Sequence, residues 1–577
     1  MQVQYNPPPV SPVSLPDGGG LTLETGVNIL NSVFKNQDFK PGQWVVITKA
    51  LSEDVNILII KPTWAGKTLP IQFLGMINRT GYTLMLVPTT SLMMEQSASF
   101  RKLGAMVACP NADKYYHKKA CEKREYWHNI ATNIVEHKLK FLILSPERLV
   151  KNPLLKQYWD TIFRPEFLNR VFIDEVHLVA SWGVTFRPCL KLCEIGRIIP
   201  RGIPMIGATA TCTPEMMPDV CAALRFQPGD VVFRDNCDRP NIEIAVKITW
   251  NMERKIIRLK LIHTMIYVLK RKGGKIILFC TTPGNCIIML NLIEDICKKR
   301  RDGVVVKARI YHGKMLPAER EHVGLLWKKG AINFICATTA FGMGVDTKDV
   351  RQVIFEGCPF SVVDYTQMLG RAGRDGNKSF VTSYLSEKTF NEALKVLAYG
   401  CFEVIHDRAT GLKCSRLKVN HRLPLRFYRL CEMYYLLVNP FLCSRSMIMQ
   451  KFAITEFERT TAWTSTCYNL KGQICSGCVR TRMAYVTAND IVWKRVDVFR
   501  RVNDIKRTIV QNLLHPGVIV EWKRIIDMYG GQSLLATWAI LELFLVDNVI
   551  SAKPQINVKT KRVKHIFVEL RNKWNQV

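Results

Sequence analysis

Short apolar runs, bounded by glycine, proline and charged residues, recur along the chain up to about residue 400. Runs of this kind are typical of strands that are buried on both faces of a parallel sheet. Stretches that suit helices follow several of them, so we expect an α/β protein. The expected strands lie at 55–60, 275–280 and 333–336 and at the starts of 83–96, 141–149, 170–180 and 308–313.

Beyond residue 400 the alternation of strand and helix fades, which indicates a different organisation. A chain of 577 residues is also too long for one hydrophobic core. We expect an amphipathic helix at 533–546 and a strand at 562–570. The expected divisions are a disordered tail at 1–25, rich in proline and glycine, two α/β domains at 26–235 and 236–400, a cysteine-rich module at 401–490 and a basic C-terminal domain at 491–577.

The composition points to a polyanionic partner. Lysine and arginine total 81 against 48 aspartate and glutamate, which gives a formal net charge of +33. Such an excess attracts nucleic acid and raises the rate of encounter with it. The apolar runs are too short or too interrupted to span a bilayer, and the N-terminus lacks a signal pattern, so we expect a soluble intracellular protein with no membrane partner.

A candidate phosphate-binding loop follows the strand at 55–60. The order strand, loop, Gly66-Lys67-Thr68, helix is the arrangement that cradles phosphate with backbone N–H groups. Lys67 would reach the terminal phosphates, and the Thr68 hydroxyl would bind Mg²⁺. The candidate nucleotide-binding residues of this loop are Thr63, Trp64, Ala65, Gly66, Lys67 and Thr68.

An acidic pair ends the strand that begins at residue 170. Asp174 and Glu175 would lie at the carboxyl end of a parallel sheet, where α/β proteins place their ligands. Asp174 would hold Mg²⁺, and Glu175 would orient and polarise the attacking water. His177 would couple this site to the rest of its domain.

Two arginines follow a helix-like segment at 362–369. Arg371 and Arg374 are expected to be presented at the helix end rather than buried, because guanidinium groups bind phosphate oxygens bidentately. They would reach a nucleotide held by the other domain. Gly344, Asp346 and Gln367, which precede them, complete this group of nucleotide-binding candidates.

The motifs together resemble those of superfamily-two helicases, and the strings AFGMG and QMLGRAGRDG are most similar to RecQ-type DNA helicases. The resemblance covers residues 26 to 480. It implies two tandem RecA-like P-loop domains with parallel sheets, followed by a zinc-binding module and a small basic C-terminal domain, for which a winged helix is the candidate fold. ATP and Mg²⁺ would bind between the two RecA-like domains, with Arg374 rather than Arg371 on the γ-phosphate.

The resemblance also assigns roles outside these motifs. Phe39 and Gln43 match the element that reads adenine in RecQ-like enzymes. The segment 182–188 matches their aromatic loop, in which a base stacks on an aromatic side chain and DNA binding is coupled to hydrolysis. The nucleic-acid-binding candidates are Trp182, Phe186, Arg187, Thr282 and His312.

Four cysteines late in the chain have the order of a zinc site. Cys443, Cys467, Cys475 and Cys478 close on a Cys-x-x-Cys pair, which suits tetrahedral thiolate coordination of Zn²⁺. RecQ-like enzymes carry a similar four-cysteine module at this place. The alternative is a set of unpaired thiols.

The expected function is that of a monomeric, ATP-dependent 3′–5′ DNA helicase of the nucleus, where the basic cluster at 298–301 resembles an import signal. Lys61 and Trp64 stand where such phosphate loops carry glycine, and Ser181 and 184–185 depart from the family's aromatic loop. One alternative is therefore a helicase-derived nucleic-acid-binding protein with impaired hydrolysis. A second alternative is an RNA helicase.

Overall fold

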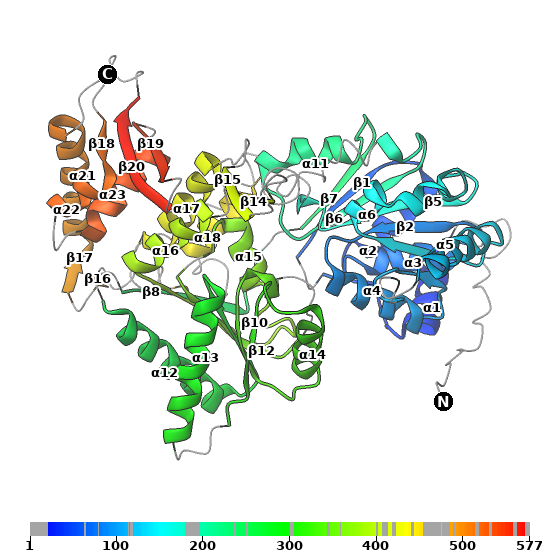
Figure 1. The fold of residues 1–577 in the computed structure, drawn as a ribbon, viewed down its shortest axis with the longest axis horizontal. Helices are drawn as coiled ribbons and strands as arrows, with labels where there is room; N and C mark the ends of the chain where they lie inside the picture. Colours follow the sequence, from blue (N-terminus) through cyan, green and yellow to red (C-terminus); the bar gives the residue numbers. More distant parts are fainter. Residues whose placement is uncertain are drawn as a thin grey trace. The chain divides into compact units, whose positions relative to one another are not determined.

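The structure is a computed structural model in which the chain divides into two compact units, the first ending at Cys237 and the second beginning at Asp238. Each unit is described by itself, and Figure 1 labels its elements. The described residues are 21–62, 65–78, 80–113, 115, 119–178, 197–235, 238–249, 252–300, 305–342, 347–357, 359–399, 402–406, 413–417, 423–439, 443–453, 475, 485–488, 491–513, 519–529, 533–547, 549–557 and 562–571.

The described strands of the first unit form a seven-stranded parallel sheet in the order β3-β4-β2-β5-β6-β1-β7. Strands and helices alternate, as the sequence predicts. The strands are β1 (Ile57–Ile60), β2 (Tyr82–Leu86), β3 (Val107–Ala108), β4 (Phe141–Leu144), β5 (Leu168–Asp174), β6 (Met205–Thr209) and β7 (Val231–Arg234). The helices are α1 (Leu23–Phe34), α2 (Gln43–Ser52), α3 (Leu69–Ile77), α4 (Thr90–Lys102), α5 (Ala120–Val135), α6 (Pro146–Lys151), α7 (Pro153–Lys156), α8 (Trp159–Ile162), η3 (Pro214–Met216) and α11 (Met217–Ala223).

The core of the first unit fixes the position of its loops. Helices α1 to α4 gather on one side of the sheet (Figure 1) and bury one continuous cluster with β1, β2 and β4. Phe73 of α3, Phe100 of α4 and Phe141 of β4 are fully buried in it. Burying an aromatic side chain stabilises a fold by roughly 1.5–3 kcal/mol. The strands are thereby held rigidly, and the loops at their ends are fixed with them.

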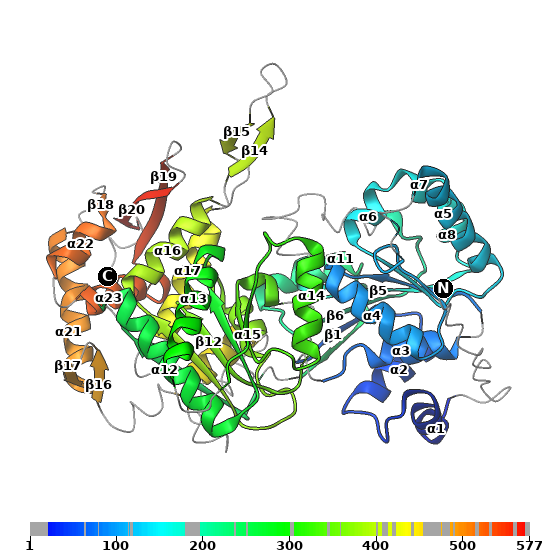
Figure 2. The same cartoon turned by 60° about the horizontal axis from the view of Figure 1, so that its bottom comes forward.

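The described strands of the second unit form a six-stranded parallel sheet in the order β10-β11-β9-β12-β13-β8. Helices α12 and α13 lie side by side on it (Figure 2) and share a buried cluster with β9 and β11. The strands are β8 (Ile242–Ile248), β9 (Lys275–Cys280), β10 (Ala308–Tyr311), β11 (Phe334–Ala337), β12 (Val350–Glu356) and β13 (Ser379–Leu385). The helices are α12 (Arg254–Lys272), α13 (Pro283–Lys299), α14 (Pro317–Lys328), η4 (Thr339–Gly342), α15 (Val362–Leu369) and α16 (Glu387–Tyr399).

The last part of the second unit contains helices and small antiparallel sheets, in agreement with the change of pattern after residue 400. The strands β18, β19 and β20 form one three-stranded sheet, and Phe427 of α17 contacts the rings of Trp522 and Phe544. The elements are β14 (Phe402–His406), β15 (Lys413–Leu417), α17 (Leu423–Val438), α18 (Ser444–Phe452), β16 (Tyr485–Ala488), β17 (Ile491–Lys494), α21 (Arg495–Thr508), η5 (Ile509–Leu513), β18 (Val520–Glu521), α22 (Trp522–Met528), α23 (Ser533–Leu545), β19 (Ile550–Asn557) and β20 (Arg562–Leu570).

Two expectations from the sequence need correction. Helix α1 begins at Leu23, inside the segment 1–25 that was assigned to the tail, and Thr22 caps it by accepting a hydrogen bond from Thr25 N. Helix α23 is not amphipathic, because Leu535, Ile540 and Leu541 on different sides of it are all buried. It packs against α17, α21, α22 and β19. Among the described residues, no helix has both the length and the apolar character needed to cross a bilayer.

Candidate active site

Three loops of the first unit meet at the carboxyl edge of its sheet. Strands β5, β6 and β1 are parallel neighbours in that order, with Asp174 opposite Ala208 and Ile60 opposite Thr209. The phosphate loop after β1, the acidic pair at the end of β5 and the threonines that end and follow β6 therefore lie together. This is the edge at which parallel sheets bind ligands.

In the phosphate loop, the side chain of Lys67 folds back onto the backbone of the loop itself. Lys67 Nζ donates hydrogen bonds to the carbonyl oxygens of Lys61 at 3.1 Å and Pro62 at 3.3 Å. Gly66 has φ +69°, and a Cβ there would lie 2.6 Å from Gln43 Nε2, so only glycine suits the position. Helix α3 begins directly after Thr68, and its first N–H groups are already used within the chain: Leu69 N donates to the Gly66 carbonyl and Ile71 N to the Thr68 carbonyl. Thr63 and Trp64 lie outside the described residues.

Gln43 is a structural partner of this loop. Its Nε2 donates to the carbonyl of Gly66 at 2.8 Å, and its Oε1 accepts from Lys40 N at 2.8 Å, while the side chain is buried. Phe39 lies close by, with its ring 5.2 Å from Trp44 and 5.5 Å from Phe73. Of the two residues predicted to read adenine, Gln43 is thus placed beside the phosphate loop, whereas Phe39 packs on the rings of Trp44 and Phe73.

Lys61 ties three segments together, a role that the sequence did not reveal. Its Nζ donates to the Pro41 carbonyl at 2.8 Å and lies 3.0 Å from the Asp235 carboxylate, with the side chain buried. Lys61 replaces the opening glycine of the usual loop. Its side chain points away from the loop and connects the Gln43 segment to the end of β7.

Asp174 is buried against Gln96 of α4. Gln96 Nε2 donates to Asp174 Oδ2 at 2.5 Å, and the Glu175 backbone N–H donates to Oδ1 at 2.9 Å. Burial and the neighbouring Glu175 charge raise the pKa of Asp174 to about 7, while Lys67 acts in the opposite direction. A divalent cation at this carboxylate would favour its ionised form in the same way as Lys67. The pair therefore fits Mg²⁺ chemistry. Gln96 was not predicted as a site residue, because nothing in its sequence context distinguishes it from any glutamine on a half-buried helix.

His177 connects the acidic pair to the segment after β6. Burial lowers the pKa of His177 to about 3, so its ring is neutral. Its Nδ1 lies 2.7 Å from Thr209 Oγ1 and 3.4 Å from Glu175 Oε2. Thr209 Oγ1 also accepts from Thr211 N and donates to Thr211 O. Since the Thr209 hydroxyl proton is already donated to Thr211 O, His177 Nδ1 must donate to Thr209 Oγ1, and we assign the Nδ1–H tautomer. Glu175 Oε2 accepts no hydrogen bond among the described residues.

In the second unit, Arg239 stabilises the turn at 370–374 that carries Arg371 and Arg374. Its guanidinium donates to the carbonyl oxygens of Gly370 at 3.2 Å, Ala372 at 2.9 Å and Gly373 at 2.8 Å. Asn241 Nδ2 donates to the Gly373 carbonyl as well, at 2.9 Å. Gly373 has φ +54°, which this turn needs and glycine permits.

The expectation that both arginines are presented at the surface is wrong for Arg371, which is 7% exposed. Helix α15 ends at Leu369, and Arg371 in the following turn lies near Tyr311. Burial raises the pKa of Tyr311, and the charges of Arg320 and Arg371 act in the opposite direction. Arg374 is half-buried, and its Nε donates to the Gly370 carbonyl at 3.4 Å. Gln367 on α15 is half-buried too. Gly344 and Asp346 lie outside the described residues.

The nucleic-acid-binding candidates have mixed outcomes. Thr282 caps helix α13 by accepting a hydrogen bond from Asn285 N at 3.2 Å, and it is half-buried. His312 follows β10 but is only 8% exposed, and its backbone N–H and carbonyl oxygen both bond to Met315. Trp182, Phe186 and Arg187 lie outside the described residues.

Two of the four candidate zinc ligands are described, and they are close together. Cys443 Sγ and Cys475 Sγ are both buried and lie 3.8 Å apart. Arg445, two residues after Cys443, is buried and donates to the carbonyl oxygens of Arg239 at 2.9 Å and Ile242 at 2.7 Å. The sulfur pair is thereby anchored near the start of the second unit. Cys467 and Cys478 lie outside the described residues.

Comparison with protein families identifies two domains. The family "DEAD/DEAH box helicase" matches residues 40–218, and the family "Helicase conserved C-terminal domain" matches residues 257–376. The first match contains Lys67, Asp174 and Glu175, and the second contains Arg371 and Arg374. The sequence patterns, the fold and the family matches thus all indicate a helicase with two conserved domains.

Curated relatives are DNA helicases by name. The chain is 30% identical over 371 residues to ATP-dependent DNA helicase Q-like 4B of Arabidopsis thaliana, covering 64% of this chain and 30% of that protein. It is 31% identical over 348 residues to putative ATP-dependent DNA helicase Q1 of Caenorhabditis briggsae, covering 60% and 53%. The chain therefore spans less than two thirds of the length of these relatives.

Solved structures share the fold. DEAD-box helicase Mss116 bound to ssRNA and UDP-BeF matches with a TM-score of 0.52 and 15% identity, over 78% of this chain and 92% of that one. The DUF1998 helicase MrfA bound to DNA matches with a TM-score of 0.51 and 17% identity, over 81% and 58%. At these identities the likeness shows two tandem RecA-like domains and nothing more specific.

Proposed function

Because the chain belongs to the RecQ-like helicases of superfamily two, we propose that it is an ATP-dependent DNA helicase that unwinds in the 3′–5′ direction. The observation that carries the proposal is the meeting of Lys67, the acidic pair and Thr209 at one sheet edge. These groups are the ones that phosphoryl transfer requires, namely a phosphate-binding lysine, a carboxylate for the metal and a carboxylate for water.

Each residue of the first unit has a distinct task in this proposal. Lys67 leaves the carbonyl oxygens of Lys61 and Pro62 and binds the terminal phosphates of ATP. Thr68 and Asp174 would hold Mg²⁺, which supplies charge neutralisation on the phosphates. Glu175 orients the attacking water, since its Oε2 lies 3.4 Å from neutral His177 and accepts no hydrogen bond among the described residues.

His177 supplies the link between hydrolysis and movement. It contacts both Glu175 and Thr209, so a shift of the acidic pair is passed on to the segment after β6. The other hydrogen bonds of the Thr209 hydroxyl lie within 209–211 and would move with that segment. The segment can therefore change its position relative to the acidic pair only if the His177–Thr209 hydrogen bond breaks. We take this contact as the first step by which nucleotide state reaches the DNA-binding surface.

Arg374 of the second unit would complete the site by stabilising charge on the γ-phosphate. It is the more accessible of the two arginines, whereas Arg371 is buried beside Tyr311. Arg239 holds the turn by three carbonyl oxygens, which gives the guanidinium of Arg374 a rigid base. Preorganised donors of this kind need no rearrangement when charge develops.

DNA is the proposed nucleic acid. The relatives are named DNA helicases, and the net charge of +33 suits a polyanion. The nucleus is the corresponding compartment. We therefore expect a duplex with a 3′ single-stranded tail to be unwound in the presence of ATP, while a duplex with a 5′ tail and a matched RNA duplex are unwound at least about tenfold more slowly. Strand-displacement assays on the three substrates measure this, and equal rates on DNA and RNA would contradict the choice of DNA.

Zinc is a further proposed component, held by Cys443, Cys467, Cys475 and Cys478. The described pair fits the ion, because two thiolates at about 2.3 Å from one tetrahedral zinc lie about 3.8 Å apart. The observed separation is 3.8 Å, well beyond the S–S bond of a disulfide, which is about 2.05 Å. The ion would fix the cysteine segments to the second unit through Arg445.

The purified protein should contain one zinc ion per chain. Replacing Cys475 with alanine should remove it, because a three-thiolate set binds far more weakly, whereas Cys431→Ala should retain it, since Cys431 is a buried thiol on α17. Elemental analysis of the three proteins after dialysis measures the zinc content. Zinc retained in full by Cys475→Ala, or absent from the wild type, would contradict the site.

A further inference from the structure

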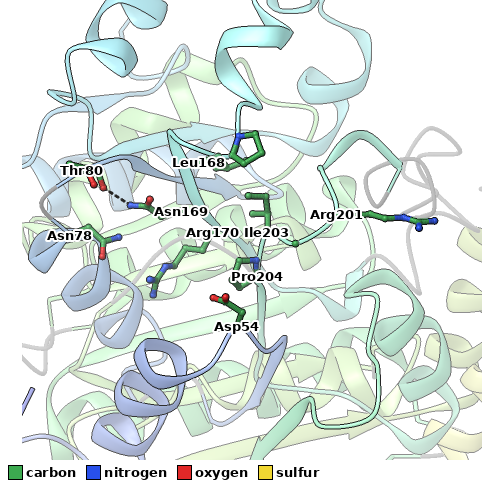
Figure 3. A pocket seen from close by; sticks show the side chains of 11 residues that line it. Asp54, Asn78, Thr80, Leu168, Asn169, Arg170, Arg201, Ile203 and Pro204 are labelled. Carbon is green, nitrogen blue, oxygen red and sulfur yellow. Dashed lines mark hydrogen bonds between the residues drawn. The ribbon is translucent and has the colours of Figure 1, made fainter. Parts of the chain in front are cut away.

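A pocket of about 460 Å³ lies at the edge of the first sheet opposite the nucleotide site. Its lining comes from segments that precede or begin β1, β2, β5 and β6, whereas the phosphate loop, the acidic pair and Thr209 lie at the carboxyl ends of β1, β5 and β6. Figure 3 shows its lining side chains. Those used below are Asp54, Asn78, Thr80, Asn169, Arg170 and Arg201.

Arg170 is the most unusual group in this pocket. It is only 8% exposed, and within the described part of the chain its Nε and Nη1 atoms are buried with no hydrogen-bond partner. Burial lowers the pKa of Arg170 to about 10, so the guanidinium is still charged at neutral pH. A buried charge without hydrogen bonds is costly, and native proteins seldom retain one.

Asn78 lines the same pocket and also has a buried nitrogen atom without a hydrogen-bond partner among the described residues. Its Nδ2 atom is buried and, among the described residues, donates to no acceptor. Figure 3 shows the Asn78 side chain and the Arg170 guanidinium directed into one space. The neighbouring amide is already used, since Asn169 Nδ2 donates to the Thr80 carbonyl at 2.7 Å. Three unpaired nitrogen atoms of two side chains therefore face one cavity, and all three are donors.

The charges at the pocket favour an anion. Asp54 acts on Arg170 electrostatically, but it is exposed and no hydrogen bond between the two is formed in the described structure. Arg201, also in the lining, is exposed and adds a second positive charge. The buried guanidinium of Arg170 therefore has no hydrogen-bonded counter-ion among the described residues. Guanidinium groups pair with carboxylate and phosphate through two parallel hydrogen bonds.

We propose that this pocket is a second ligand site, which binds the phosphate or carboxylate group of a small molecule through Arg170 and Asn78. The oxoanion would accept hydrogen bonds from Arg170 Nε or Nη1 and from Asn78 Nδ2. The volume is large enough for more than the anionic group alone, so the ligand has a further, uncharged part. The site does not depend on the proposed helicase activity, because none of its residues belongs to the nucleotide site.

Calorimetric titration with sodium phosphate and, separately, sodium acetate tests the proposal. The titrations are done on Lys67→Ala protein at constant ionic strength, so that the phosphate loop contributes little. We expect saturable binding of at least one of the two probes, and which probe binds distinguishes a phosphate ligand from a carboxylate ligand. Arg170→Met in the same background should weaken binding by about tenfold or more, because charge-assisted hydrogen bonds are lost.

A second measurement separates ligand binding from a structural role of Arg170. In chloride buffer alone, Arg170→Met should unfold at the same temperature as the parent or higher, since it removes an uncompensated buried charge. The probe should raise the unfolding temperature of the parent but not that of Arg170→Met or Asn78→Leu. Arg201→Ala, at the exposed rim, is the matched control and should keep most of the effect. No saturable binding by the parent, or undiminished binding by both Arg170→Met and Asn78→Leu, would overturn the proposal.

Discussion

Lys67→Ala should reduce DNA-stimulated ATP hydrolysis by at least about a hundredfold. The Lys67 ammonium donates to the carbonyl oxygens of Lys61 and Pro62, which belong to the same loop. Those oxygens can be exchanged for phosphate oxygens, which bind a cation more strongly. Alanine cannot supply this charge, so the terminal phosphates would lose their main contact in the loop.

Binding of single-stranded DNA should be largely unchanged in Lys67→Ala, because the rest of the basic surface is intact. Steady-state phosphate release and fluorescence anisotropy with labelled DNA measure the two properties separately. Lys102→Ala, an exposed lysine at the end of α4, is the matched control and should hydrolyse ATP at the wild-type rate. Wild-type hydrolysis by Lys67→Ala would place the nucleotide elsewhere.

Arg374→Ala should lower the rate of hydrolysis by about a thousandfold while leaving ATP affinity within a few fold of the wild type. An arginine that reaches the γ-phosphate acts mainly on the charge that develops in the transition state, so its loss is felt in kcat more than in binding. The turn itself should survive, because Arg239 bonds its carbonyl oxygens and not the Arg374 side chain.

Arg374→Lys should recover only part of this loss, since lysine keeps the charge but not the planar fork of donors. Arg271→Ala, an exposed arginine in the last turn of α12, is the matched control. Single-turnover hydrolysis with saturating DNA measures the chemical step directly. If Arg374→Ala retains the wild-type rate, another group stabilises the γ-phosphate.

The regular elements were predictable because their patterns are local. The strand at 275–280, the helix at 362–369 and the strand at 562–570 have the bounds that the sequence indicates. The carboxyl-edge position of the acidic pair followed from parallel topology alone.

The contacts that hold the site were not predictable, because they join distant segments. Gln96 bonds Asp174 across 78 positions of the chain, and Arg239 holds a turn more than 130 positions away. The same limitation explains Arg371, whose burial depends on how the turn is pinned rather than on its own sequence. Arg170 is a further case, since a charged residue at the start of a strand normally faces solvent and gives no sign of being enclosed.

The central claim is that Lys67, Asp174 and Arg374 act on one ATP molecule. The most direct test is an experimental structure of the full chain with Mg²⁺, a non-hydrolysable ATP analogue and single-stranded DNA. The account predicts that the Lys67 ammonium and the Arg374 guanidinium both lie within hydrogen-bond distance of the γ-phosphate, with Mg²⁺ next to Asp174. A nucleotide bound by the phosphate loop while Arg371 and Arg374 both face away from it would contradict the account.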